Sequence, residues 1–199
     1  GTPLTIFSDK VSRSKHYAFF SRLREEYRIT KKSRRATLFG RIIMEGGNNT
    51  PPFWRYDWHQ KNLLMSSYHL SESNMKAYYD KLVSYKTEEI FTYPSSIIPL
   101  AEYIVKNKLP KLKLKLIMTT AENLSNYQRE VITCAFDAPI VNQYGCTEMS
   151  FFVVDDGNGM LVQPEHGIIE IRNALGDVSF NGSGELIATG LINWSMPII

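Results

Sequence analysis

The feature that most constrains the fold is a regular alternation of apolar and amphipathic segments between residues 62 and 142. Short apolar segments predict buried strands, and the amphipathic segments between them predict helices. The expected strands cover residues 62–66, 90–93, 114–118 and 139–142, and the expected helices cover residues 71–85, 94–107 and 125–136. The last helix starts with Ser125 and Gln128 at the spacing of a capping box. Strands that alternate with helices over short links are typical of an α/β fold with a mainly parallel sheet and right-handed crossovers.

The segments on either side of this core have other patterns. Before it, we expect a short strand at residues 5–7, an amphipathic helix at 14–29, a strand at 37–44 and an aromatic loop at 51–59. After Ser150, short strands separated by turns begin with a hairpin over residues 151–163. They predict a β-rich subdomain, either antiparallel or barrel-like. The sequence thus predicts an α/β core at residues 1–150 and a β-rich subdomain at residues 151–199.

Composition narrows the class of protein. With 43% hydrophobic and 12% aromatic residues, the chain has the composition of a globular protein. No apolar run approaches the roughly 20 residues that span a bilayer, and the first residues lack the order of a signal peptide. We therefore expect a cytoplasmic protein with no membrane partner. The two cysteines, Cys134 and Cys146, do not have the spacing of metal ligands.

Positive charge is concentrated near the N-terminus. Residues 1–41 contain eleven Lys and Arg against three Asp and Glu, and the remainder contains twelve against seventeen. A basic segment, together with Arg55 among the aromatic residues of the 51–59 loop, would suit a nucleic acid. A solvated helix face explains the charge more simply, so nucleic-acid binding is the less favoured alternative.

Polar turns follow three successive strands of the predicted sheet. They read Tyr93-Pro94-Ser95-Ser96, Thr119-Thr120-Ala121-Glu122 and Tyr144-Gly145-Cys146-Thr147-Glu148. Because ligands of such sheets bind at the carboxyl ends of the strands, we expect these turns to form one cleft. In the third turn an aromatic ring can cover a base, a glycine permits close approach, a hydroxyl can donate to phosphate and a carboxylate can hold Mg²⁺. The pattern predicts a nucleotide site, with a tight turn between core strands as the alternative.

The order of these motifs resembles that of adenylate-forming enzymes, in particular the phenylacetate-CoA ligase family and its CapK-like relatives in capsular polysaccharide biosynthesis. Tyr93-Pro94-Ser95 is similar to a helix start of that family, and Tyr144 to Glu148 is similar to its core motif. Gly1-Thr2-Pro3-Leu4 resembles the end of its phosphate loop. The segments Gly184-Glu185-Leu186, Thr189-Gly190-Leu191 and Met196-Pro197-Ile198-Ile199 continue the run. The resemblance covers most of the chain and implies the central part of the large N-terminal domain.

The resemblance also implies a role for each residue of the nucleotide cleft. Tyr144 would stack on the adenine of ATP, beside Gly145, and Ala121 and Glu122 would line the other face of the base. For Glu122 a carboxylate at a helix start, favoured by the helix dipole, is an equal alternative. Thr147 would contact the α-phosphate and Glu148 would hold Mg²⁺, so both are expected to be catalytic. Gly1 and Thr2 would contact the β- and γ-phosphates.

The implied reaction joins a carboxylic acid to ATP as an acyl-adenylate, with loss of pyrophosphate, and passes the acyl group to CoA or another acceptor. Tyr68, His69 and Tyr93 would lie near the carboxylic acid. The rest of the family's phosphate loop, its ribose-binding Asp and its smaller domain with a catalytic lysine are not in the sequence. We therefore expect this chain alone to bind nucleotide weakly without adenylating a substrate. A non-catalytic scaffold of the same fold is the alternative, and open sheet edges would favour a homodimer or aggregates.

Overall fold

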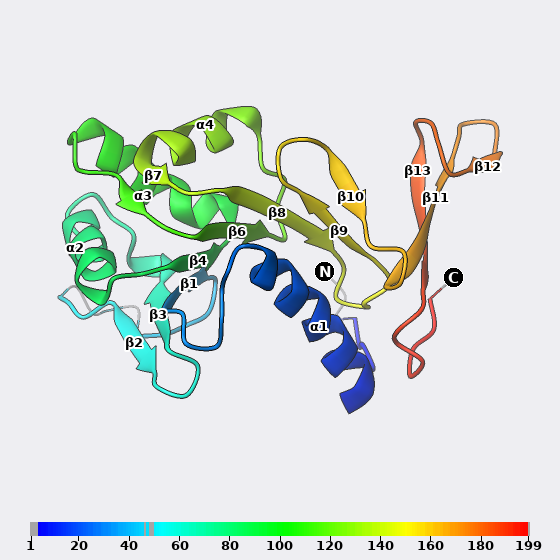
Figure 1. Ribbon diagram of the computed structural model, residues 1–199, viewed down its shortest axis with the longest axis horizontal. Helices are drawn as coiled ribbons and strands as arrows, with labels where there is room; N and C mark the ends of the chain where they lie inside the picture. The colour runs from blue at the N-terminus through cyan, green and yellow to red at the C-terminus, as the bar shows by residue number, and fades with distance from the viewer. Residues whose placement is uncertain (1–3, 46, 48–49, 199) are drawn as a thin grey trace. The chain divides into compact units, whose positions relative to one another are not determined.

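The computed structural model describes residues 4–45, 47 and 50–198 of the chain (Figure 1). It divides into two compact units. The first, called the α/β unit below, comprises Arg24–Asn142. The second, called the β-rich unit, combines Gly1–Leu23 with Gln143–Ile199. The domain boundary predicted after residue 150 stays a prediction.

The α/β unit is built around a mostly parallel sheet. Its strands are β1 (Arg35–Phe39), β2 (Trp54–Asp57), β3 (Asn62–Ser66), β4 (Glu89–Thr92), β6 (Leu116–Thr120) and the first half of β8 (Ile140–Gly145). They lie in the order β8-β6-β4-β1-β3-β2. The pairs β1 with β3, β1 with β4 and β4 with β6 are parallel, and β2 is antiparallel to β3. The predicted α/β class with a mainly parallel sheet is confirmed.

Helices connect these strands. They are the 3₁₀ turn η1 (Ser67–His69), α2 (Met75–Tyr85), α3 (Pro94–Lys106) and α4 (Asn126–Ala135). A small second sheet pairs β5 (Leu112–Lys113) with β7 (Phe136–Asp137) in parallel. The capping box predicted for α4 is present, since Ser125 Oγ accepts from the Gln128 N–H at 3.2 Å and Ser125 N–H donates to Gln128 Oε1 at 2.9 Å. Pro94 occupies the first turn of α3, where its missing N–H leaves no helix bond unmade.

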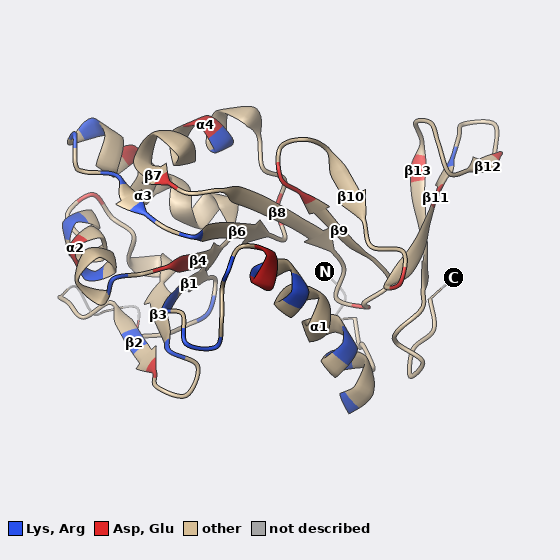
Figure 2. Ribbon diagram, in the orientation of Figure 1, with Lys and Arg blue, Asp and Glu red and all other residues tan. Residues whose placement is uncertain are grey.

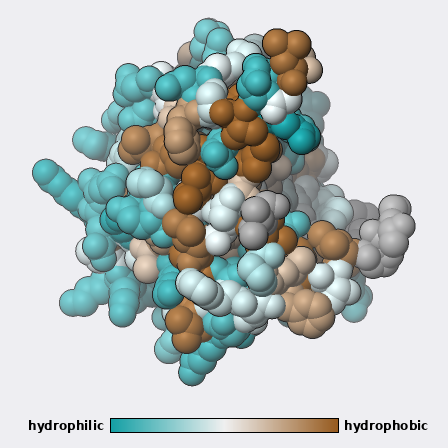
Figure 3. Space-filling view, turned by 90° about the vertical axis from the view of Figure 1, so that its right-hand side faces the viewer, coloured by the Kyte–Doolittle hydropathy of each residue, from teal (hydrophilic) through white to brown (hydrophobic). Residues whose placement is uncertain are grey.

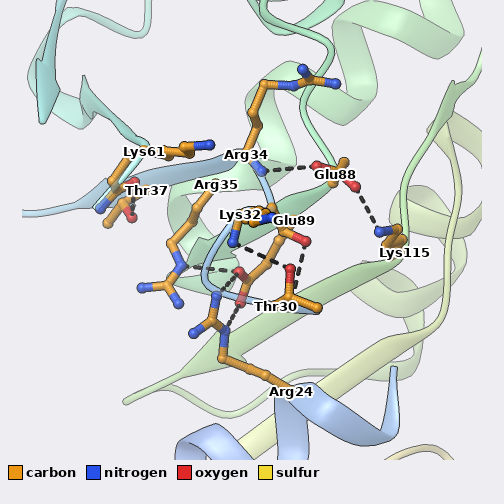
Figure 4. A network of polar contacts seen from close by, with 12 residues as sticks. Arg24, Thr30, Lys32, Arg34, Arg35, Thr37, Lys61, Glu88, Glu89 and Lys115 are labelled. Atoms are coloured by element: carbon orange, nitrogen blue, oxygen red, sulfur yellow. Dashed lines mark hydrogen bonds and ion pairs between the residues drawn. The ribbon is translucent and has the colours of Figure 1, made fainter. Parts of the chain in front are cut away.

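The core of the α/β unit is apolar and includes one deeply buried carboxylate. Leu38, Ile90 and Ile117, on three neighbouring strands, are fully buried. Glu89, at the start of β4, is also fully buried. Its carboxylate accepts two bonds from Arg24, at 2.8 and 2.7 Å, and one from Arg35 at 3.0 Å (Figure 4). The paired guanidinium groups compensate the cost of burying this charge.

The β-rich unit contains two antiparallel arrangements. The hairpin of β9 (Phe152–Asp155) and β10 (Met160–Val162) follows the end of β8. A separate three-stranded sheet has the order β12-β11-β13, from β11 (Gly167–Arg172), β12 (Val178–Ser179) and β13 (Glu185–Gly190). Many apolar side chains here stay exposed, and brown apolar atoms lie among polar ones on the face shown in Figure 3. Exposed examples are Leu175, Val178, Phe180, Leu186 and Trp194.

Four expectations about the N-terminal half need correction. Residues 5–7 form no strand. The first helix, α1 (Lys10–Glu26), starts earlier than expected because Asp9 Oδ1 accepts from the Ser12 N–H at 2.7 Å, as an N-cap does. The second strand ends at Phe39. The predicted aromatic loop contains β2. Trp54 and Tyr56 alternate with the exposed Arg55, which is a strand pattern, but the two prolines before Phe53 argue against a strand in the sequence.

Candidate functional site

Two tyrosines predicted to bind the carboxylic acid lie together at the carboxyl edge of the α/β sheet. Tyr68 follows β3, Tyr93 follows β4, and Gly40 follows β1 between them. Tyr68 Oη donates to the Gly40 carbonyl at 3.1 Å. A Cβ added to Gly40 would lie 3.8 Å from Tyr93 Cε2 and 3.9 Å from Tyr68 Oη. The Tyr93 ring also packs against Phe39 at a centroid distance of 4.8 Å, so this edge presents an aromatic wall.

His69, the third residue predicted to lie near the carboxylic acid, is held within the core. Its ring is stacked on Phe53 at 5.5 Å, and its Nδ1 lies 2.7 Å from Ser66 Oγ. His69 Nε2 is buried and has no hydrogen-bond partner among the described residues. The ring therefore has one nitrogen with a hydrogen-bond partner and one that is buried without a partner among the described residues.

Glu122 forms a cap on a neighbouring helix. It follows β6 and Ala121, which has a left-handed backbone with a φ of 65°. Both carboxylate oxygens of Glu122 accept from Ser95, at 2.9 Å from the backbone N–H and 2.8 Å from Oγ. Ser95 is in the first turn of α3, where the helix dipole favours a negative charge. Ser95 was not predicted from the sequence as the partner of Glu122, because the two residues lie 27 positions apart.

In the β-rich unit, the end of β8 presents an exposed aromatic ring. Tyr144 is 47% exposed, and its ring packs against Phe151 at 5.0 Å. The next residue leaves little room for a side chain, because a Cβ at Gly145 would lie 2.7 Å from Gln143 Nε2 and 3.2 Å from the Phe151 carbonyl oxygen. Gly145 thus keeps the backbone beside the Tyr144 ring free of a side chain.

The turn after Gly145 is closed from within. Cys146 Sγ lies 2.9 Å from Ser150 Oγ and accepts from the Ser150 N–H at 3.4 Å. The Met149 N–H donates to the Cys146 carbonyl at 3.1 Å, and Met149 has a φ of 61°. Cys146 therefore shapes this turn.

Thr147 and Glu148 occupy the middle of this turn. Asn193 Nδ2 donates to the Glu148 carbonyl at 3.2 Å, which fixes the backbone. Within the described part of the chain, neither the Thr147 hydroxyl nor the Glu148 carboxylate has a hydrogen bond or ion pair. Both groups can therefore contact a ligand without first breaking another interaction.

The donor set fits Mg²⁺ only if phosphates complete its coordination. Among the described residues, no group of three His, Cys, Asp or Glu side chains could hold a metal ion. Mg²⁺ bound with nucleotides uses one or two carboxylates together with phosphate oxygens and water, so the single carboxylate of Glu148 is sufficient. Gly1 and Thr2, predicted to contact the phosphates, lie outside the described residues.

Comparison with solved structures identifies the class of fold as that of adenylation domains. The chain is similar to 2-hydroxyisobutyryl-CoA ligase in the postadenylation state, with a TM-score of 0.64 and 17% identity over 94% of this chain and 41% of that chain. It is also similar to the Vibrio cholerae adenylation domain AlmE, with a TM-score of 0.56 and 14% identity over 97% of this chain and 38% of that chain. At these identities the likeness shows the fold alone.

The particular protein to which the sequence is similar is CapK of Staphylococcus aureus. The two are 27% identical over 201 aligned positions, which cover all of this chain and 44% of CapK. The chain thus spans less than half the length of this relative. No protein-family model matches the chain. The predicted resemblance to CapK-like adenylate-forming enzymes is confirmed. Among the described residues, no helix has both the length and the hydropathy that a membrane span requires.

Proposed function

We propose that this chain is the nucleotide-binding part of an enzyme that activates a carboxylic acid as an acyl-adenylate and transfers it to CoA or another acceptor. The observation that carries the proposal is the segment from Tyr144 to Glu148. It places an exposed ring, a glycine with little room for a side chain, an unengaged hydroxyl and an unengaged carboxylate on one short turn.

The chemistry of these groups supports adenylate formation. In-line attack of a carboxylate on the α-phosphate builds negative charge on phosphate oxygens, which a hydroxyl donor and a divalent cation stabilise. We assign the Thr147 hydroxyl to the α-phosphate and the Glu148 carboxylate to Mg²⁺. The solved relatives support this reaction class, since the AlmE structure contains glycyl-adenosine-5′-phosphate and the 2-hydroxyisobutyryl-CoA ligase structure contains R3-HIB-AMP.

The remaining predicted residues complete the proposal. We assign Ala121 to the adenine, and Tyr68 and Tyr93 to the carboxylic acid, because the aromatic wall around Gly40 offers apolar area to an acyl group. A place for His69 near the carboxylic acid rests on resemblance, since its unpartnered Nε2 is buried. CoA as the acyl acceptor, and Gly1 and Thr2 as phosphate contacts, rest on resemblance alone.

A calorimetric titration with Mg-ATP tests the proposal. Stacking of a base on an aromatic ring contributes about 1–3 kcal/mol, so Tyr144→Ala is expected to weaken ATP binding by roughly tenfold or more. Tyr127→Ala is the matched control, because Tyr127 is also exposed and its hydroxyl donates to Glu102 at 3.1 Å, in the α/β unit. Absence of ATP binding by the parent chain would indicate a scaffold without a nucleotide site, and equal binding by both variants would place the nucleotide away from Tyr144.

A further inference from the structure

The edge of the α/β sheet opposite the aromatic wall is rich in basic residues. Parallel strands start at a common edge, and the residues before β1, β3, β4 and β6 therefore lie on the same side of the unit. Blue segments precede β1, β4 and β6 in Figure 2. The basic residues of this edge, called the amino edge below, are Arg28, Lys31, Lys32, Arg34, Lys61, Lys86, Lys111, Lys113 and Lys115. All are exposed except the half-buried Arg34.

Hydrogen bonds join the segments that carry these cations into one continuous surface. Tyr85 Oη donates to the Lys61 carbonyl at 2.7 Å, and Arg34 Nε donates to the Lys86 carbonyl at 2.9 Å. Lys115 Nζ lies 2.6 Å from a carboxylate oxygen of Glu88 and 3.4 Å from the Arg28 carbonyl. Figure 4 shows Lys32, Arg34, Lys61 and Lys115 in one view around this network.

The amino edge keeps an excess of positive charge after its acids are counted. Glu88 is paired with Lys115, and Glu89 is buried between Arg24 and Arg35, so neither presents a free negative charge. The other acids on the segments of this edge are Glu25, Glu26, Asp57 and Asp137. Nine cations against these four and Glu88 leave a net charge of 9 − 5 = +4.

Apolar groups lie beside these cations. A pocket of about 350 Å³ has the apolar side chains of Leu82, Leu112 and Leu114 in its lining and the three lysines Lys86, Lys111 and Lys113 around them. On the turn between β2 and β3, the Trp58 ring is 82% exposed and packs edge-on against Tyr56 at 4.2 Å. Trp58 is thus held outward, three residues from Lys61.

We propose that the amino edge docks on an anionic lipid surface. Lysines and arginines near such a surface are attracted to its phosphate headgroups, and tryptophan favours the boundary between headgroups and acyl chains. The pocket offers an apolar space beside the lysines, which a lipid can fill and a nucleic-acid backbone cannot. For this reason the combination of exposed lysines, an apolar pocket and an exposed tryptophan favours a lipid surface over a nucleic acid. Attachment would be peripheral and would leave the opposite edge, with Tyr93 and Glu122, open to small molecules.

Co-sedimentation with vesicles tests this inference. The parent chain is expected to bind vesicles of equimolar phosphatidylcholine and phosphatidylglycerol and not to bind vesicles of phosphatidylcholine alone. It should dissociate from the anionic vesicles as the salt concentration is raised. The double variant Lys86→Glu, Lys113→Glu is expected to bind at least about tenfold more weakly, since each cation near an anionic surface contributes on the order of 1 kcal/mol. Lys10→Glu with Lys15→Glu on α1 makes the same change in net charge away from this edge and should bind as the parent does.

Tryptophan fluorescence gives a second readout. On the mixed vesicles the emission of the parent is expected to shift to shorter wavelength, and Trp58→Ala should remove that shift while circular dichroism stays unchanged. Equal binding to neutral and anionic vesicles, or no binding to either, would overturn the proposal. Tighter binding to a single-stranded oligonucleotide than to anionic vesicles at equal phosphate concentration would also overturn it and would identify the edge as a nucleic-acid surface.

Discussion

At the scale of single residues, Glu148 allows a direct test of the Mg²⁺ assignment. If its carboxylate holds Mg²⁺, Glu148→Gln removes the charge and keeps the shape, so ATP binding should lose most of its dependence on Mg²⁺. We expect roughly a tenfold weaker affinity with Mg²⁺ and little change in EDTA. Titrations of parent and variant with and without Mg²⁺ measure this difference. A variant that still responds to Mg²⁺ as the parent does would place the metal elsewhere.

Glu122 has two candidate roles that a pair of variants can separate. Its carboxylate caps α3 through Ser95, and a charge at a helix N-terminus contributes about 0.3–1 kcal/mol. Glu122→Gln and Ser95→Ala should therefore lower the free energy of unfolding by similar amounts, measured in urea. If Glu122 also contacts adenine, only its own replacement should weaken ATP binding directly. Equal loss of ATP affinity in both variants would show that Glu122 acts by holding the Ala121 turn.

At the scale of elements, the half-buried His16 and the buried His166 fasten α1 within the β-rich unit. His16 Nδ1, on α1, lies 2.9 Å from His166 Nε2, and Phe19 and Phe152 flank the His166 ring at 4.9 and 5.7 Å. Burial lowers the pKa of His166 from 6.5 to about 4, and burial also lowers the pKa of His16. The unfolded chain thus binds protons more readily than the folded chain. The stability that the neutral histidine pair contributes is therefore complete above pH 6.5 and is lost as pH falls toward 4.

Urea unfolding across this pH range checks the prediction. The parent should lose up to about 3 kcal/mol of stability through this pair between pH 6.5 and about 4. His166→Gln, which cannot titrate, should lose less stability over the same pH interval. His59→Gln, at an exposed position, should show the same pH dependence of stability as the parent. Parallel pH profiles for the parent and His166→Gln would show that carboxylates, not this pair, govern the acid transition.

The same elements show what the sequence could predict. The strand at Asn62–Ser66 and the capping box of α4 follow local rules of periodicity and hydrogen bonding, and both are confirmed. The bond from Ser95 to Glu122 and the contact of His16 with His166 join residues 27 and 150 positions apart. Such contacts depend on how the elements pack, which no local pattern encodes. Tyr68 and Tyr93 were predicted from the family resemblance, which gave no role to Gly40 between them.

At the scale of the whole molecule, the two units differ in how much of their structure is buried. The largest fully buried side chains include Tyr78, Phe53, Phe136, Leu38 and Ile90 of the α/β unit. Among the residues that the structure describes, Phe152 is the single member of that group from the β-rich unit. Along β11 and β13 most residues are half-buried or exposed. Since apolar burial is the main source of stability, the three-stranded sheet should open far more often than β1, β4 and β6.

Hydrogen exchange followed by mass spectrometry measures this difference. Amides of β11 and β13 are expected to exchange at least about a hundredfold faster than those of β4 and β6, because opening free energies range from near zero up to that of global unfolding. Adding Mg-ATP should then slow exchange in the peptide that holds Tyr144 to Glu148, and Tyr144→Ala should abolish that slowing. Uniform protection across both units would show that the chain unfolds as one cooperative body. If ATP still slows exchange in Tyr144→Ala, the nucleotide binds without this ring. That result would contradict the assignment of Tyr144 to the adenine, on which the adenylation proposal rests.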